Sequence, residues 1–201
     1  MQISVKNNIK EVTKGLNDIQ RKQIPFATAR ALTFTAKDGA KYINKATTKF
    51  IDRPNPFTKR AFAFMKATKQ TLTSMVFAKD VQGEYLKHII DGGTRNRQTG
   101  KPYPVSASKK LLDAYGNFGK GYSRIRSAKK KKNRFIANIN GTQGLWERLP
   151  NNKLKLLAGF EQRNVSYRKS FPVYELLTRF VQREFTKKFI RSLQSALRTA
   201  R

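Results

Sequence analysis

Apolar residues recur at helical spacing near both ends of the chain. From about residue 8 to residue 50 they fall at three- and four-residue steps, which predicts a long N-terminal helix. Pro25 interrupts this pattern and predicts either the start of a second helix or a kink in one long helix. After Pro25 the apolar face is rich in alanine, so another element of the protein can approach it closely.

The strongest helical pattern runs from residue 172 to about residue 200. Pro172 suits a helix start, and the apolar residues after it step by four: Val173, Leu177, Val181, Phe185, Phe189, Leu193 and Leu197. Three more widen this stripe, Leu176, Phe180 and Ile190, and the opposite face is basic, with Arg179, Arg183, Lys187, Arg191 and Arg198. A basic amphipathic helix of about thirty residues suits a sheet surface or a membrane surface. We favour the sheet and predict that Phe185 is buried.

Strand patterns occupy two regions between these helices. At residues 61–69 and 71–79, alternating apolar residues predict a hairpin in which Phe62 and Phe64 face one way. Alternation returns at residues 134–162, with Asn140-Gly141 and residues 150–152 as turns. Trp146 is predicted to anchor the core or the edge of this second region. We therefore predict one α+β domain covering residues 1–201: a mainly antiparallel sheet from both regions, packed by the two long helices.

A short helix is predicted directly after the first hairpin. Asp80 suits its N-cap, and Gly92-Gly93 suits its end. Its apolar residues lie at helical spacing: Val81, Tyr85, Leu86 and Ile89.

Composition points to a negatively charged partner. The chain has 43 Lys and Arg against 12 Asp and Glu, a net charge of +31. Such a protein repels itself and attracts polyanions. The charge fits contact with nucleic acid or with an acidic partner surface. It equally fits a solvated basic surface inside a large assembly.

The cations are concentrated in residues 94–133, which we predict to be a long basic loop. Between residues 95 and 134 there are thirteen Lys and Arg and one acid, Asp113, with aromatic residues interleaved. Such spacing suits stacking on bases or a loop that orders on assembly, and we favour assembly. The candidate residues for contact with DNA or a partner are Arg95, Arg97, Lys101, Lys109, Lys110, Lys120, Arg124, Arg126, Lys129, Lys130, Lys131 and Lys132.

The residues offer little for catalysis. The absence of cysteine excludes disulfides and cysteine-ligated zinc, and no phosphate-binding glycine loop is present. Asp80, Glu84 and His88 share a helical face, with Asp91 beyond, but capping and exposed ion pairs explain them better than a metal ion does. We therefore predict no enzyme activity, no catalytic or metal-binding residues and no cofactor.

The sequence also bears on location. No apolar run of about 18 residues predicts a membrane-spanning helix, and the first ten residues lack the apolar core of a signal peptide. We therefore expect a protein that is made and kept in a cytoplasm, or built into a particle there.

Residues 52–93 contain four short motifs: RPNPFTKRA, VFAKD, a YL pair and a GG pair. Together with the final run FTKKFIRSLQSALRTAR, they resemble the tail-completion or minor tail proteins of tailed bacteriophages, the protein Z-like group. That group combines a long N-terminal helix with an RP-x-PF-T-x-(K/R)-A turn. The matching residues here are Arg53, Pro54, Pro56, Phe57, Thr58, Ala61, Val76, Phe77, Lys79, Asp80, Tyr85, Leu86, Gly92 and Gly93.

The resemblance implies a structural role in the virion. It implies a homo-oligomeric ring at the head–tail junction, for which we expect six- or twelve-fold symmetry. The expected partners are other neck, portal, adaptor or tail proteins, with packaged DNA as a further candidate and no membrane. The alternative is a basic nucleic-acid-binding protein associated with the nucleoid or the ribosome.

Overall fold

The computed structural model describes residues 18–95, 103–106, 108–117, 129–130, 132–161 and 164–199. The fold is α+β, with long N- and C-terminal helices and antiparallel sheets. The chain forms two compact units: Met1–Asp91 with Lys169–Arg201, here called the helical unit, and Gly92–Arg168, the sheet unit. The sequence predicted a single domain. Each of the two units buries apolar residues in a cluster of its own, and the single domain stays a prediction.

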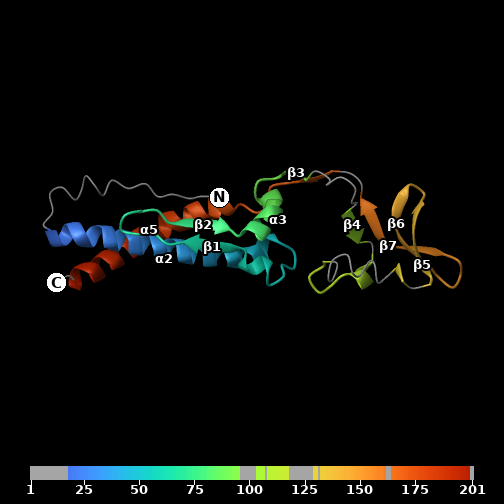
Figure 1. The fold of residues 1–201 in the computed structure, drawn as a ribbon, viewed down its shortest axis with the longest axis horizontal. Coiled ribbons are helices and arrows are strands. Elements are labelled where there is room, and N and C mark those ends of the chain that lie inside the picture. Colours follow the sequence, from blue (N-terminus) through green and yellow to red (C-terminus); the bar gives the residue numbers. More distant parts are fainter. Residues whose placement is uncertain are drawn as a thin grey trace. The chain divides into compact units, whose positions relative to one another are not determined.

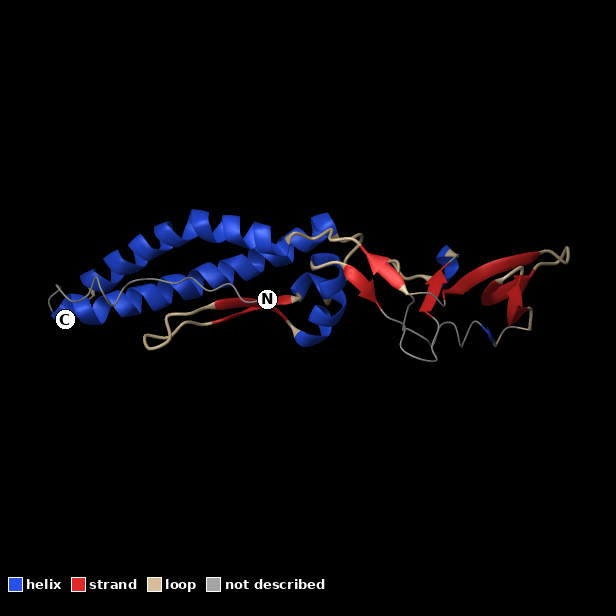
Figure 2. Ribbon diagram, turned by 90° about the horizontal axis from the view of Figure 1, so that it is seen from above, coloured by secondary structure: helices blue, strands red, loops and turns tan. Residues whose placement is uncertain are grey.

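Two long helices form the body of the helical unit, α2 (Asp18–Phe50) and α5 (Val173–Arg198). They lie side by side and antiparallel (Figures 1 and 2). Arg30 donates a hydrogen bond of 3.3 Å to Ser195 near one end, and Tyr42 stacks on Phe180, with ring centroids 5.1 Å apart, nearer the other. Pro25 lies inside α2, so the single-helix alternative is the one observed. The predicted first turns, residues 8–17, lie outside the described residues.

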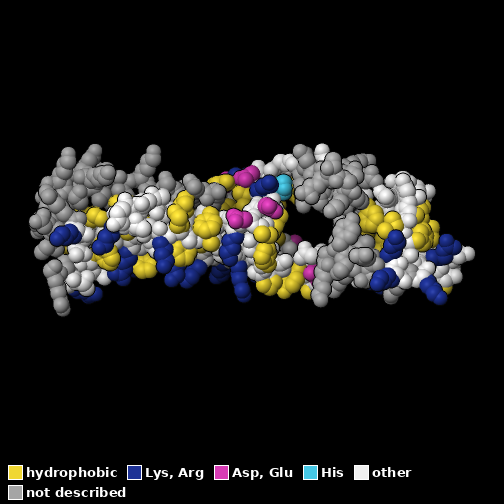
Figure 3. All heavy atoms as spheres, in the orientation of Figure 1, with side chains coloured by type: hydrophobic (Ala, Val, Ile, Leu, Met, Phe, Trp, Pro, Cys, Tyr) yellow, Lys and Arg dark blue, Asp and Glu magenta, His cyan; other side chains and the backbone are white. Residues whose placement is uncertain are grey.

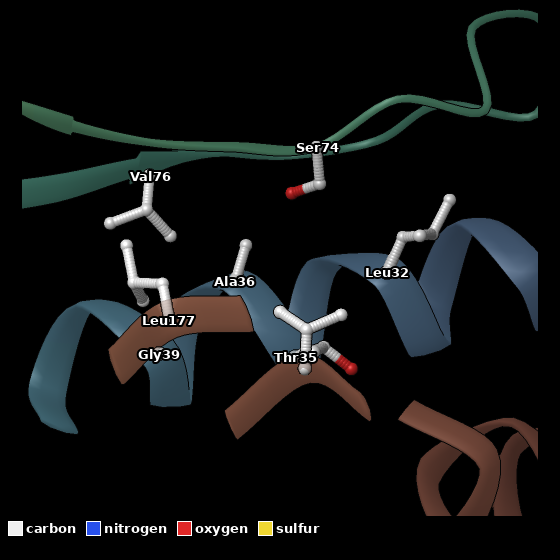
Figure 4. Close-up of a pocket in the computed structure, with 8 residues that line it drawn as sticks. Leu32, Thr35, Ala36, Gly39, Ser74, Val76 and Leu177 are labelled. Carbon is white, nitrogen blue, oxygen red and sulfur yellow. The ribbon is translucent and has the colours of Figure 1, made fainter. Parts of the chain in front are cut away.

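Small residues allow α2 to pack closely on its neighbours. A Cβ added at Gly39 would lie 3.3 Å from Leu177 Cδ2, closer than comfortable carbon contact. Figure 4 shows this region, where Val76 and Ser74 of the hairpin approach Ala36 of α2. A cavity of about 30 Å³ remains between these elements. The alanine-rich face predicted after Pro25 is therefore the face that packs.

The first hairpin consists of β1 (Phe62–Met65) and β2 (Met75–Ala78), which pair antiparallel with Phe64 opposite Val76. The strands are shorter than predicted, because residues 66–74 carry no strand. The loop still closes in a tight turn, since the Thr68 amide donates a 3.0 Å hydrogen bond to the Thr71 carbonyl. Phe62 and Val76 are buried against the helices, as the alternation predicted. Asn44 of α2 holds the free edge of β1, since its side chain exchanges two hydrogen bonds with the backbone of Phe62, of 2.8 and 2.9 Å.

Helix α3 (Asp80–Ile90) follows the hairpin. The 3₁₀ turn η2 (Thr58–Arg60) lies just before the hairpin in the chain. Its N-cap is Lys79, which makes no side-chain capping hydrogen bond, and Asp80 is the first helical residue. An acid in the first turn still complements the helix dipole. Gly92 follows the helix with φ 76°, the left-handed conformation that glycine adopts readily.

The buried stripe of α5 departs from the predicted steps of four. Leu197 and Ile190 are 43% and 49% exposed, whereas Ser192 and Ala196 are buried. Phe185 is only half-buried, whereas the sequence analysis predicted that it is buried. An α-helix has 3.6 residues per turn, so each step of four overshoots by about 40° and the stripe rotates away from the core.

The sheet unit holds a four-stranded antiparallel sheet in the order β4-β7-β6-β5. Its strands are β4 (Tyr103–Ser106), β5 (Arg134–Ile139), β6 (Thr142–Arg148) and β7 (Leu154–Glu161). Asn140 and Gly141 both have positive φ, 49° and 77°, as a two-residue hairpin turn requires. Trp146 is half-buried, and its Nε1 donates to the Ala137 carbonyl at 3.1 Å. The predicted second β region is therefore present.

Two further predictions about the strands are wrong. The hairpin and the second β region do not share a sheet. Residues 94–133 are not one loop, because β4 pairs with β7, and β3 (Gly93–Arg95) pairs with β8 (Val165–Tyr167). The same segment contains the 3₁₀ turn η3 (Lys109–Leu111), whose Leu111 is buried with Leu145 and Leu157. These strands pair with partners 52 to 74 residues away in the chain, which local composition does not reveal.

Candidate interaction surfaces

The proline turn at residues 53–58 is tied firmly to α3. Arg53 has φ 43°, an unusual value for a residue before proline, and Pro54 is buried. The Asn55 side-chain oxygen accepts a 2.8 Å hydrogen bond from the Thr58 amide. The Thr58 hydroxyl lies 2.9 Å from the hydroxyl of Tyr85 on α3. Residues from two motifs of the resemblance are therefore joined by one hydrogen bond.

This turn leaves an open hollow with apolar walls beside the start of α3. The hollow has a volume of about 600 Å³ and is lined by Pro56, Phe57, Arg60, Lys79, Asp80, Val81 and Gln82. Phe57 is 51% exposed and Val81 is 62% exposed. Gln82 occupies the inward position instead, and its side-chain amide donates to the Phe57 carbonyl at 3.4 Å.

The chemistry of this hollow suits an apolar side chain of a partner. Phe57 and Val81 present carbon surface to solvent, while Arg60, Lys79 and Asp80 supply both signs of charge around it. An apolar centre with a charged rim is the usual composition of a protein–protein contact. The sequence placed Phe57 in the proline-turn motif and Val81 on the short helix but did not predict their exposure.

Six of the twelve predicted contact residues lie in the described part of the sheet unit. Lys109 and Lys110 on η3 are exposed, as are Lys129, Lys130 and Lys132. The backbone of Arg95 belongs to β3, and its side chain is not among the described ones. The remaining candidates lie outside the described residues: Arg97, Lys101, Lys120, Arg124, Arg126 and Lys131.

The one acid of the basic segment has a local structural role. An oxygen of the Asp113 carboxylate accepts hydrogen bonds of 2.9 Å from the amides of Tyr115 and Asn117. The Asp113 amide in turn donates to the Asn117 carbonyl at 2.8 Å. Asp113 therefore stabilises a turn, and the neighbouring ring of Tyr115 is 40% exposed.

A metal or catalytic centre does not emerge from the described residues. Within them, no three His, Cys, Asp or Glu side chains gather as metal ligands would. Asp80 and Glu84 are exposed on α3, and His88 is half-buried. Asp91 follows the helix as its C-cap. In the same part of the chain, no helix is both long enough and apolar enough to span a membrane.

Shifted pKa values occur at the start of α5 and have local causes. Burial raises the pKa of Tyr174, and the nearby Asp91 carboxylate adds to this rise. Lys169 and Glu175 form an ion pair of 2.7 Å, and that hydrogen bond raises the pKa of Lys169 and lowers the pKa of Glu175. Both groups stay charged near neutral pH, so these residues form a structural contact rather than an acid–base pair.

Comparison of the chain with models of known protein families, with curated proteins and with solved structures finds no match.

Proposed function

We propose that this chain is a structural protein of a tailed bacteriophage, a tail-completion component that forms a ring at the head–tail junction. The motifs at residues 53–93 and the final basic run support this role through their resemblance to the protein Z-like group. The protein would be built into the virion in the host cytoplasm. Its partners would be copies of itself and the neighbouring neck, portal, adaptor or tail proteins.

The observation that carries the proposal is the open hollow around Phe57 and Val81. A ring of identical subunits needs two different surfaces on each subunit, one fitting the other. Two apolar side chains with more than half of their surface exposed supply one such surface. A firmly bonded turn holds Phe57 in place, so little conformational freedom would be lost when a neighbour docks.

Sedimentation velocity of the full chain tests this proposal. The wild-type protein is expected to sediment as a closed ring with one stoichiometry. Val81→Asp is expected to convert it to monomers, because a carboxylate would enter the apolar contact unpaired. Val81 is 62% exposed, so the substitution should leave the fold intact, as far-UV circular dichroism would show.

Ile190→Asp is the matched control. Ile190 also lies on a helix and is 49% exposed, but it is far from the hollow in sequence and does not line it. The control is expected to keep the ring. A monomeric wild-type protein, or rings in Val81→Asp, would rule out the hollow as a subunit contact.

A further inference from the structure

The two long helices carry an excess of cations that their own acids do not neutralise. From residue 19 to residue 50, seven Lys and Arg accompany one acid, Asp38, which pairs with Lys188 of α5. The acids of α5 are Glu184, which pairs with Arg183 at 2.9 Å, and Glu175, which pairs with Lys169. Figure 3 shows Lys and Arg side chains following these helices, whereas several of the acids visible on that face lie around α3.

One row of these cations is regular. Lys37, Lys41, Lys45 and Lys49 follow one another at four-residue steps along α2, and all four are exposed. The rise of an α-helix places them about 6 Å apart, in a row about 18 Å long. Among the described residues, none of the four forms an ion pair. Like charges at this spacing destabilise a helix slightly, and a bound polyanion would remove that cost.

Helix α5 adds cations and aromatic rings next to this row. One hollow of about 330 Å³ has Lys45, Lys49, Tyr42 and Phe50 of α2 on its wall, together with Leu176 of α5. A second hollow, of about 200 Å³, has Arg30 and Phe34 of α2 beside Arg191 of α5.

A ring contact and a cation–π contact also lie along α2 and α5. Tyr42 stacks on Phe180, and the Arg183 guanidinium lies 5.9 Å from the Phe180 ring centroid. We call the cations of this face the basic seam: Arg30, Lys37, Lys41, Lys45, Lys49, Arg183 and Arg191.

We propose that the basic seam binds the phosphate backbone of duplex DNA without reading its sequence. Phosphates follow one another every 3.4 Å along each strand, so a row that rises about 18 Å along α2 spans about five of them. Because each step of four overshoots a turn by about 40°, the row winds around α2 by about 120° rather than running straight. An acidic protein surface rarely offers negative charge at such even spacing. Tyr42 and Phe50 already stack on Phe180 and Phe171, which favours a role in supporting the seam over one in receiving unpaired bases.

This site differs from the one that the sequence predicted, because it lies in the helical unit rather than in residues 94–133. It does not require the ring proposed above. Phosphate contacts position a protein on DNA but carry no sequence information, so binding should be general.

The test compares two variants of equal charge change in DNA binding across a salt series, with a labelled duplex of arbitrary sequence as the probe. The seam variant carries Lys41→Gln, Lys45→Gln, Lys49→Gln and Arg191→Gln. Its slope of log affinity against log salt should be shallower than the wild-type slope by about 3 to 4, since each phosphate contact contributes about 0.9.

The matched control carries Lys109→Gln, Lys110→Gln, Lys129→Gln and Lys130→Gln, all exposed cations of the sheet unit. It loses the same four charges, but its slope should stay within about 1 of the wild-type value. Equal losses in the two variants would show that net charge alone attracts DNA, and would overturn the proposal. So would a larger loss in the control, or stronger binding of poly-glutamate or single-stranded DNA than of the duplex.

Two further variants separate DNA contact from folding and from ring formation. Lys41→Arg, Lys45→Arg and Lys49→Arg together keep the charge and should keep wild-type binding, whereas a loss would mean that the seam is structural. Val81→Asp should bind duplex DNA with the wild-type slope per subunit whether or not it forms rings. Binding that disappears with Val81→Asp would assign DNA contact to another surface and overturn the proposal.

Discussion

Different interactions stabilise the interior of the helical unit and the interior of the sheet unit. Twelve buried residues form one cluster in the helical unit, contributed by α2, α3, α5 and the hairpin, whereas four form the cluster of the sheet unit. Because burial of apolar surface is the main favourable term in folding, the helical unit has the larger source of stability. The sheet unit depends more on strand pairing, on its turns and on one ion pair, Arg134–Glu147 at 2.8 Å.

The contrast teaches that a uniform basic composition can support two kinds of folded structure. In the helical unit the cations stay on exposed helix faces, and a continuous apolar interior forms beneath them. In the described part of the sheet unit few large apolar residues are fully buried. Gly144 allows β6 to approach Ala158 of β7 closely. We therefore expect the sheet unit to unfold before the helical unit.

The largest effect is expected from Phe171→Ala in the helical unit. Phe171 is fully buried, stacks on Phe50 at 5.2 Å and meets Phe62 edge-on at 6.1 Å. Its truncation should lower the free energy of unfolding by about 3–5 kcal/mol, as measured by denaturant unfolding with far-UV circular dichroism. Phe185→Ala is the control, and because Phe185 is half-buried it should cost clearly less. Equal costs would mean that Phe171 is not central to the cluster.

Leu145→Ala should weaken the sheet unit selectively. Leu145 is fully buried in a cluster of only four residues, and its truncation should cost about 2–5 kcal/mol. Trp146 is the only tryptophan, so its fluorescence reports this unit, while far-UV circular dichroism mainly reports the long helices. Fluorescence should shift to lower denaturant in the variant and circular dichroism should not. A single transition seen by both probes would show that the two units unfold together.

Two glycine substitutions should have opposite signs in the two units. A Cβ at Gly144 in β6 would lie 2.5 Å from the Ala158 carbonyl oxygen, so Gly144→Ala should cost about 1–3 kcal/mol. At Gly83 in α3 the nearest atoms are 3.7 Å away, so Gly83→Ala should stabilise by up to about 1 kcal/mol through helix propensity. Thermal unfolding of both variants measures the signs. Stabilisation by Gly144→Ala would mean that β6 and β7 approach each other less closely at this position.

The smallest effect is expected where the proline turn joins α3. Tyr85→Phe removes the hydroxyl that lies 2.9 Å from Thr58, and should cost about 1 kcal/mol. Tyr115→Phe, at an exposed ring of the sheet unit, should leave the stability unchanged. If Tyr85→Phe is also neutral, the turn is held by its own hydrogen bonds and not by α3.

Features that depend on nearby residues were predicted correctly from the sequence. The helical state of residues 173–198, the glycine after α3 and the Asn140-Gly141 turn each rest on backbone preferences within a few positions. The proline turn was predicted for the same reason, since Pro54 and Pro56 restrict their own backbone and that of the residues before them.

Features that depend on distant residues were decided only by the tertiary structure. The pairing of β4 with β7, the division into two units and the exposure of Val81 each depend on which surface meets which. The basic seam is of the same kind: the cations of α2 and α5 are visible in the sequence, but the approach of Arg30 to Arg191 follows from antiparallel helix packing. Periodicity states which residues share a face of one element, and it does not state what that face will contact.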